Sequence, residues 1–259
     1  FGFSVAPHEV VKCGVWAKGR FRGEQMLYHS ERIYGIDISK YQHVHKRRVY
    51  GIDWRNLRIT RLGHTADRNA LGAVDYPVSF VYIKSTEGLT VFNPYYTQDV
   101  RAARRYGFPV GAYHFFSTRP AMSQADYFLK KSRLQKGDLP PMLDVELSDR
   151  RIAAMGGRDV LFREMLVWLK EIGRRSGTTP IIYVSQDFVN RYMPFAPEEL
   201  KAYPVWVARY GEYKPYVHLL YWQLSPDGRV RGIQGDVDID VFNGSEEQFK
   251  RYLRTQTVK

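Results

Sequence analysis

Short apolar runs recur along this chain, and most of them end in polar residues. The clearest run extends from Leu139 to Glu146. It opens with prolines, which lack the amide hydrogen that a sheet interior requires and so belong at a strand's entrance. Its body is apolar, and it ends in Asp144 and Glu146. Because successive strand side chains point to opposite faces, these two acids share one face, with Cα atoms about 6.5–7 Å apart.

Similar runs predict eight strands in all, with helical patterns between most of the early ones. The predicted strands are 33–39, 78–84, 110–116, 139–146, 180–184, 204–208, 218–223 and 237–240. The predicted helices are 94–106, 121–135, 160–175, 186–192 and 245–253. Alternating strands and helices indicate a parallel sheet, and eight strands could close into an α/β barrel. Because the last three strands lack long helices, we predict an irregular TIM-like barrel with about five helices. An open doubly wound sheet is the alternative, weakened by the lack of a Gly-rich phosphate loop.

The segments outside this pattern suggest additions to one catalytic domain. Residues 1–31 are difficult to interpret, although 10–16 could form a short strand, and we treat them as an N-terminal extension before a barrel domain at 32–259. Residues 43–50 are predicted to be a basic loop. Residues 58–77 are polar and contain glycines and a proline, which is typical of an insertion on the barrel's rim.

Composition narrows the class of partner. The chain has 259 residues, 44% hydrophobic and 15% aromatic, which suffices for a large core and suits ring stacking on sugars. The formal net charge of +12 favours an anionic partner. No nucleic-acid recognition motif is evident, so we expect no nucleic-acid partner. Cys13 is the only cysteine, so no internal disulfide can form.

Polar residues gather at the predicted C-terminal ends of the strands, where barrel enzymes carry their catalytic groups. They are Asp37, Glu87, His114, Asp144, Glu146, Tyr183, Gln223 and Asp238. Neighbouring buried carboxyls can divide acid and base roles, as glycoside hydrolysis requires. Ion-pair networks also produce such pairs. A metal site is disfavoured among the acids, because they lack the mixture of carboxylate, carbonyl and histidine ligands that such sites usually have. His43 and His45 have no further ligands nearby in the sequence, and we expect them to lie in a solvated loop.

The motifs along the chain, taken in order, resemble those of the family 25 glycoside hydrolases, the Ch-type lysozymes or N-acetylmuramidases. The resemblance rests on Gly35–Ser39 with Gln42, on 52–54, 80–88, 111–115 and 143–146, and on 206–210, 221–223 and 237–240. It implies a barrel of eight strands and five helices. It also implies hydrolysis of the β-1,4 bond between N-acetylmuramic acid and N-acetylglucosamine in peptidoglycan.

By motif position, Asp37, Asp144, Glu146 and Asp238 match the family's acidic cluster, with Glu146 as general acid. We expect the following residues to bind substrate: Tyr82, Tyr113, Tyr183, Trp206, Tyr210 and Gln223. We expect no cofactor and no metal. We expect peptidoglycan and an anionic cell-envelope polymer as partners, and we expect the protein to act as a monomer. The resemblance also predicts a secreted or cell-envelope protein whose export signal or anchor is not part of this sequence.

Two alternative functions remain open. A cell-wall-binding protein could keep the fold without activity, but binding alone does not require Asp144 and Glu146 together. A barrel chitinase would carry further aspartates upstream on the same strand, where this chain has Pro140, Met142 and Leu143. The departures from the family pattern, at 1–31, 43–50 and 58–77, leave the acids in place but leave substrate preference open. Glu87 is expected to bind nearby backbone, and His114 to be a hydrogen-bonded core histidine.

Overall fold

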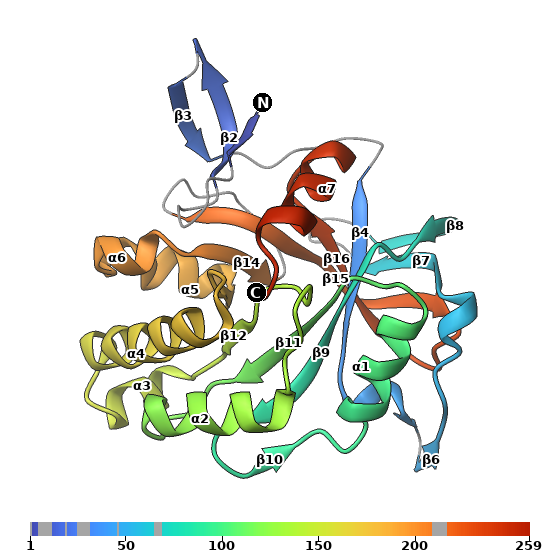
Figure 1. The fold of residues 1–259 in the computed structure, drawn as a ribbon, viewed down its shortest axis with the longest axis horizontal. Coiled ribbons are helices and arrows are strands. Elements are labelled where there is room, and N and C mark those ends of the chain that lie inside the picture. Colours follow the sequence, from blue (N-terminus) through green and yellow to red (C-terminus); the bar gives the residue numbers. More distant parts are fainter. Residues whose placement is uncertain are drawn as a thin grey trace.

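The chain folds around a closed barrel, shown in Figure 1. The computed structural model describes residues 2–4, 12–18, 20–24, 32–45, 47–64, 69–208 and 217–259. The barrel strands are β4 (Ile33–Ile38), β9 (Phe80–Glu87), β11 (Val110–Phe115), β12 (Met142–Val145), β13 (Ile181–Ser185), β14 (Pro204–Ala208), β15 (His218–Arg231) and β16 (Val237–Phe242). All eight predicted strands are therefore confirmed.

The order of the strands confirms an irregular barrel and not an open sheet. Neighbours from β4 through β9, β11, β12, β13 and β14 to β15 are parallel. β16 is antiparallel to both β15 and β4, and it closes the ring. A short connection returns the chain in the opposite direction, whereas a parallel crossover needs a dozen or more residues. Only residues 232–236 join β15 to β16, too few for a parallel crossover, so β16 runs antiparallel to β15 and the sheet is mixed.

Seven α-helices are found in the described residues, and five of them were predicted. They are α1 (Tyr96–Arg105), α2 (Ala121–Ser132), α3 (Asp149–Ala154), α4 (Arg158–Ser176), α5 (Gln186–Arg191), α6 (Glu198–Lys201) and α7 (Glu246–Thr255). The short α3 and α6 were missed. Three 3₁₀ turns are also present: η1 (Lys40–Gln42), η2 (Trp54–Asn56) and η3 (Met193–Phe195). The apolar stripe of α4, from Leu161 to Ile172, is buried against the barrel, and Gly177 ends that helix with a φ of +67°.

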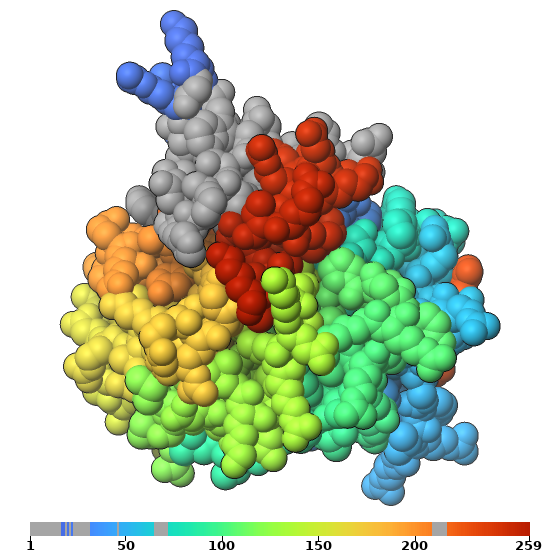
Figure 2. Space-filling view, in the orientation of Figure 1, coloured from blue at the N-terminus to red at the C-terminus, as the bar shows by residue number. Residues whose placement is uncertain are grey.

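The C-terminal helix α7 closes one end of the barrel. Its Phe249 packs on Phe80 and Phe242, with ring centroids 5.7 and 5.0 Å apart, and Tyr252 joins the same cluster. Figure 2 shows the helix lying between the segments coloured green and those coloured yellow to orange. Beyond it, the Val258 amide donates to the Asp138 carbonyl and the Val258 carbonyl accepts from the Gly137 amide, which fixes the end of the chain. The opposite end, where the parallel strands finish, is called the mouth here.

Additional strands decorate this barrel. Residues predicted as a polar rim insertion form a hairpin of β7 (Arg58–His64) and β8 (Asn69–Pro77), and β7 pairs with the last residues of β15. The basic loop contains a small hairpin, β5 (Val44–His45) and β6 (Arg48–Val49), while β10 (Val91–Phe92) pairs with β9. The β5–β6 hairpin lies at the far end from α7 (Figure 1).

The N-terminal residues form a separate sheet of three antiparallel strands. These are β1 (Gly2–Ser4), β2 (Lys12–Ala17) and β3 (Arg20–Glu24), so the short strand expected at 10–16 is present as β2. The proposed domain boundary after residue 31 falls outside the described residues and stays a prediction. No helix in the described part of the chain has the length and apolar character that crossing a membrane would require.

Candidate active site

Aromatic side chains fill the barrel between α7 and the mouth. Tyr82 and Trp206 have no exposed surface, and their rings meet edge to face with centroids 5.0 Å apart. The Tyr82 hydroxyl donates to the carbonyl of Pro140, which precedes β12 and so lies toward the closed end. Gly111 makes room for this ring, because a Cβ there would lie 2.3 Å from Tyr82 Cε1. These rings form the floor on which the polar residues of the mouth rest.

Four acids from three strands meet above this floor. Asp37 on β4 pairs in register with Asp238 on β16, and Asp144 and Glu146 come from β12 and the residue after it. The charges of all four raise the pKa of the Tyr113 hydroxyl, after the larger effect of its burial, and they act on Tyr183 in the same way. The structure therefore brings together the four acids that the sequence predicted.

The carboxyl groups of Asp37, Asp144 and Glu146 differ in how much of their surface is exposed. Asp37 and Asp144 are buried, with 8% and 6% of their surface exposed, whereas Glu146 is exposed at the mouth. Burial raises the pKa of Asp37 to about 7, and the charge of Glu146 adds to this while a hydrogen bond with Gln223 opposes it. Burial and then Glu146 hold the pKa of Asp144 well above its usual range. Although Glu146 is exposed, partial desolvation by the groups around it raises its pKa, and Lys84 opposes the shift. The cluster therefore retains protons near neutral pH.

Neighbouring polar groups complete the mouth. The Tyr183 hydroxyl donates to Gln223 Oε1 at 3.4 Å, and Tyr113, Tyr183 and Gln223 are each less than 10% exposed. Lys84 was not predicted as a site residue. Its Nζ lies 2.7 Å from Glu87 Oε2 and 4.4 Å from the centre of the Phe115 ring. Lys84 thus places a positive charge beside the acids, which favours their ionised forms.

Asp240 is an acid of this cluster that the sequence analysis missed. It is fully buried on β16, and burial followed by the charges of Asp37 and Asp238 holds its pKa well above its usual range. The sequence did contain a clue to it. Asp238 and Asp240 alternate along a strand in the same way as Asp144 and Glu146, so the pair shares the inner face.

Two of the predicted substrate contacts need revision. Tyr82 and Trp206 lie wholly inside the barrel, so the prediction that they touch substrate is wrong for this structure. The close approach allowed by Gly111 lets the Tyr82 ring lean toward the closed end, where its hydroxyl donates to the Pro140 carbonyl. Tyr210 lies outside the described residues. Tyr113, Tyr183 and Gln223 do lie beside the acids, and their contact with substrate stays a prediction.

The other polar candidates have structural partners. His114 is a buried core histidine, as expected; it contacts Thr86 and Gln124, and burial lowers its pKa to about 4. Glu87 forms an ion pair with Lys84, not the expected contact with backbone. Among the described residues, no three His, Cys, Asp or Glu side chains are grouped so as to hold a metal ion.

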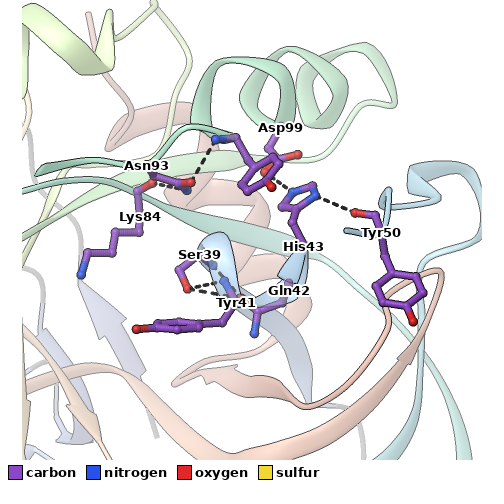
Figure 3. Close-up of polar contacts among 9 residues, drawn as sticks. Ser39, Tyr41, Gln42, His43, Tyr50, Lys84, Asn93 and Asp99 are labelled. Atoms are coloured by element: carbon purple, nitrogen blue, oxygen red, sulfur yellow. Dashed lines mark hydrogen bonds and ion pairs between the residues drawn. The ribbon is translucent and has the colours of Figure 1, made fainter. Parts of the chain in front are cut away.

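His43 is not in a solvated loop, contrary to the prediction. It is 1% exposed and lies between two partners, as Figure 3 shows. Its Nε2 is 2.7 Å from Asp99 Oδ2, its Nδ1 is 2.9 Å from the carbonyl of Tyr50, and its ring stacks on Tyr95. Burial has the largest single effect on the pKa of His43 and lowers it, but the hydrogen bond to Asp99, the charge of Asp99 and the bond to the Tyr50 carbonyl together outweigh it, and the net shift is upward. The histidine anchors the 43–50 segment to α1.

Comparisons with known proteins agree with this geometry. The chain is 33% identical to YegX of Escherichia coli over 228 residues, which cover 86% of this chain and 74% of that protein. It is 29% identical to Lysozyme M1 of Streptomyces globisporus, over 82% of this chain and 68% of that protein. The structure of a bacterial lysozyme from Streptomyces coelicolor superposes with a TM-score of 0.69 at 26% identity, covering 88% of this chain and 98% of that one.

A second solved structure, the family 25 glycosyl hydrolase from Bacillus anthracis, shares the fold with a TM-score of 0.67 at 24% identity, covering 90% of this chain and 99% of that one. The profile described as "Glycosyl hydrolases family 25" matches residues 36–233, a range that contains Asp37, Asp144 and Glu146. Barrel, carboxyl cluster and profile agree, and this chain belongs to glycosyl hydrolase family 25.

Proposed function

We propose that this glycoside hydrolase cleaves the β-1,4 bond between N-acetylmuramic acid and N-acetylglucosamine in peptidoglycan. The observation that carries the proposal is the carboxyl pair at the end of β12, with Asp144 buried and Glu146 exposed at the mouth. Relatives named as a lysozyme and as muramidases support the choice of substrate. Cleavage of chitin and binding without cleavage are the alternatives that the experiment below separates.

Glu146 is proposed as the general acid because of its position and its pKa. A group that protonates the leaving glycosidic oxygen must reach it directly, and of the two β12 acids only Glu146 is exposed. Partial desolvation by the groups around it raises the pKa of Glu146, which keeps a proton available for transfer. After the bond breaks, the resulting carboxylate can remove a proton from the attacking water.

Asp144 is proposed to orient the acetamido group at C2 of N-acetylmuramic acid. Its carboxylate would accept a hydrogen bond from the acetamido N–H, and this bond favours the ionised form of Asp144. With Asp144 ionised, the proton that the two carboxyls retain resides on Glu146, where it is needed for transfer to the glycosidic oxygen. The acetamido oxygen attacks C1 from the opposite face, so the product keeps the β configuration. Substrate-assisted hydrolysis of this kind is one of the exceptions to the two-carboxylate scheme.

The remaining residues have supporting roles in this proposal. Asp37 and Asp238 maintain the field and hydrogen bonds around the pair, and Tyr113, Tyr183 and Gln223 contact sugar hydroxyls or the acetamido group. Tyr210 stays a proposed contact on its motif alone. Inversion is the competing scheme, with Asp37 or Asp238 as base. We also propose a secreted or cell-envelope location and monomeric action, with basic surface residues binding an anionic envelope polymer at low salt.

The decisive experiment compares the wild-type protein, Glu146→Gln and Glu247→Gln. Glu247 is an exposed acid on α7 at the far end of the barrel, so its variant is a matched control. With purified peptidoglycan, Glu146→Gln should lose about 10²–10⁴-fold in the rate of releasing reducing ends, and Glu247→Gln none. Mass spectrometry should find reducing-end N-acetylmuramic acid. Release from chitin alone would favour a chitinase, and wild-type binding without release would favour a binding protein.

The stereochemistry of the first product tests the mechanism separately. Proton NMR during early turnover distinguishes the two anomers before they equilibrate. The acetamido mechanism requires the β-anomer to form first. An initial α-anomer would rule out this mechanism and favour inversion across Asp37 or Asp238, without affecting the assignment of substrate.

A further inference from the structure

A cavity of about 530 Å³ lies beside the mouth, outside the acid cluster. Its lining includes His45, Thr60, Arg229, Arg231, Gln234 and Asp236. Four of these six residues come from the end of β15 and the turn that joins it to β16, and Asp236 comes two residues before Asp238. The Gln42 side chain, just beyond the end of β4, donates to the Asp236 carbonyl at 3.0 Å. The cavity therefore adjoins the place where the acids act.

Its walls are fixed by contacts with the rest of the fold. His45 follows His43, which Asp99 and Tyr50 hold in place (Figure 3). A Cβ added to Gly235 would lie 3.3 Å from His45 Nδ1, so the turn and the hairpin approach closely at this side of the cavity. The other wall is the ladder between β15 and β7. A preformed cavity loses little conformational freedom when a ligand binds.

The charges in the cavity favour an anion. Arg229 bonds to Asp236 at 2.6 Å, so these two charges offset one another. Arg231 is exposed and acts on Asp75, whose pKa it lowers less than Arg58 does. Asp75 is already engaged, because Arg58 Nε lies 2.5 Å from its carboxylate and Arg58 Nη2 2.8 Å from its carbonyl. Among the described residues, no acid is hydrogen-bonded to Arg231.

We propose that this cavity binds a carboxylate of the peptide stem carried by the N-acetylmuramic acid residue. The inference rests on the proposed function, since it requires a muramic acid at Glu146. A guanidinium fork suits a carboxylate, which it can bind through two hydrogen bonds. The acids of the mouth repel the carboxylates of the peptide stem. A cation beside the mouth, such as Arg231, would hold one of these carboxylates away from the acids. A volume of about 530 Å³ lies within the roughly 300–1,000 Å³ common for ligand sites.

The test compares two glycans and two arginines. Glycan strands that carry peptide stems are prepared, and part of the preparation is stripped of peptide by an amidase. Wild-type protein, Arg231→Ala and Arg105→Ala are assayed on both. Arg105 is an exposed arginine at the end of α1, away from the mouth, and its variant removes the same charge. Thermal unfolding verifies that each variant is folded.

We expect Arg231→Ala to raise KM for peptide-bearing strands by roughly threefold to fivefold, as befits an exposed ion pair. Its kcat, and both constants on stripped strands, should match wild type, and Arg231→Glu should raise KM further. A synthetic stem peptide, titrated into Glu146→Gln and followed by NMR, should bind with Arg231 present and lose affinity without it.

Any of three results would overturn the inference. The first is an equal change in KM on both glycans, and the second is an equal effect of the two arginine variants. The third is a stem peptide that binds equally well with and without Arg231. A wild-type protein that cleaves neither glycan overturns the proposed function instead, and the peptide titration then judges the cavity by itself.

Discussion

Replacing Asp37 with asparagine should stabilise the folded protein at alkaline pH while it abolishes most activity. Asp37 is 8% exposed, and burial raises its pKa from 3.8 to about 7. An acid whose pKa is higher in the folded state binds its proton more tightly there. The raised pKa of Asp37 therefore does not reduce the free energy of unfolding at a pH below the pKa that Asp37 has in the unfolded chain. Stability is lost as the pH rises from about 4 through 7.

The size of this cost follows from the shift. A difference of about three pKa units corresponds to about 4 kcal/mol of unfolding free energy at pH 8, falling to about 2 kcal/mol at pH 5 and to almost nothing below pH 4. Asparagine keeps the shape of the side chain and removes the charge. Asp37→Asn should therefore exceed wild type in stability by up to about 4 kcal/mol at pH 8. Because Glu146 and Asp144 share the cluster, their own protonation reduces the gain.

Urea unfolding at pH 4, 5, 6.5 and 8 measures this difference. Asp159→Asn is the control, because the Asp159 side chain is 88% exposed, and its stability difference from wild type should stay within about 1 kcal/mol, the size expected for an acid in the first turn of a helix. The reasoning fails if Asp37→Asn is no more stable than wild type at pH 8. It fails equally if the gain persists unchanged at pH 4.

Two further variants test the anchor and the floor of the site. His43→Ala leaves Asp99 buried and unpaired, so urea unfolding should show a loss of about 3–5 kcal/mol in the free energy of unfolding. The loss should be larger at pH 8 than at pH 5, because protonation at the lower pH neutralises Asp99. A loss no larger than that of His45→Ala would contradict this. Gly111→Ala places a Cβ 2.3 Å from the Tyr82 ring and should cost about 1–3 kcal/mol or more in thermal unfolding. Gly51→Ala, with nothing within 4 Å of its added Cβ, should be nearly neutral.

The strands and the acids were predictable because local pattern determines both. Strands of a closed barrel are covered on both sides, so their sequences are apolar runs such as 139–146. Acids at the ends of such runs converge once the strands are parallel, which is why Asp37, Asp144 and Glu146 could be grouped without coordinates.

The depth of each side chain was not predictable in the same way. Tyr82 and Tyr183 both face the barrel interior, yet only Tyr183 lies beside the acids. Gly111, on the neighbouring strand, lets Tyr82 lean the other way. His43 was misjudged because its partner, Asp99, is 56 residues away on a helix. Such outcomes depend on contacts between distant segments, which no local pattern encodes.

The length of β15 has a consequence for redesigning this enzyme. The strand has 14 residues. Its early part belongs to the barrel and includes Gln223, and its last residues pair with β7 and line the cavity beside the mouth. One continuous strand thus connects this cavity with the acid cluster. A graft intended to alter the cavity proposed to bind peptide stems should exchange 58–77 and 229–236 as a unit, with the cut placed after Gly228. Moving either piece alone would break the ladder and displace Gln223.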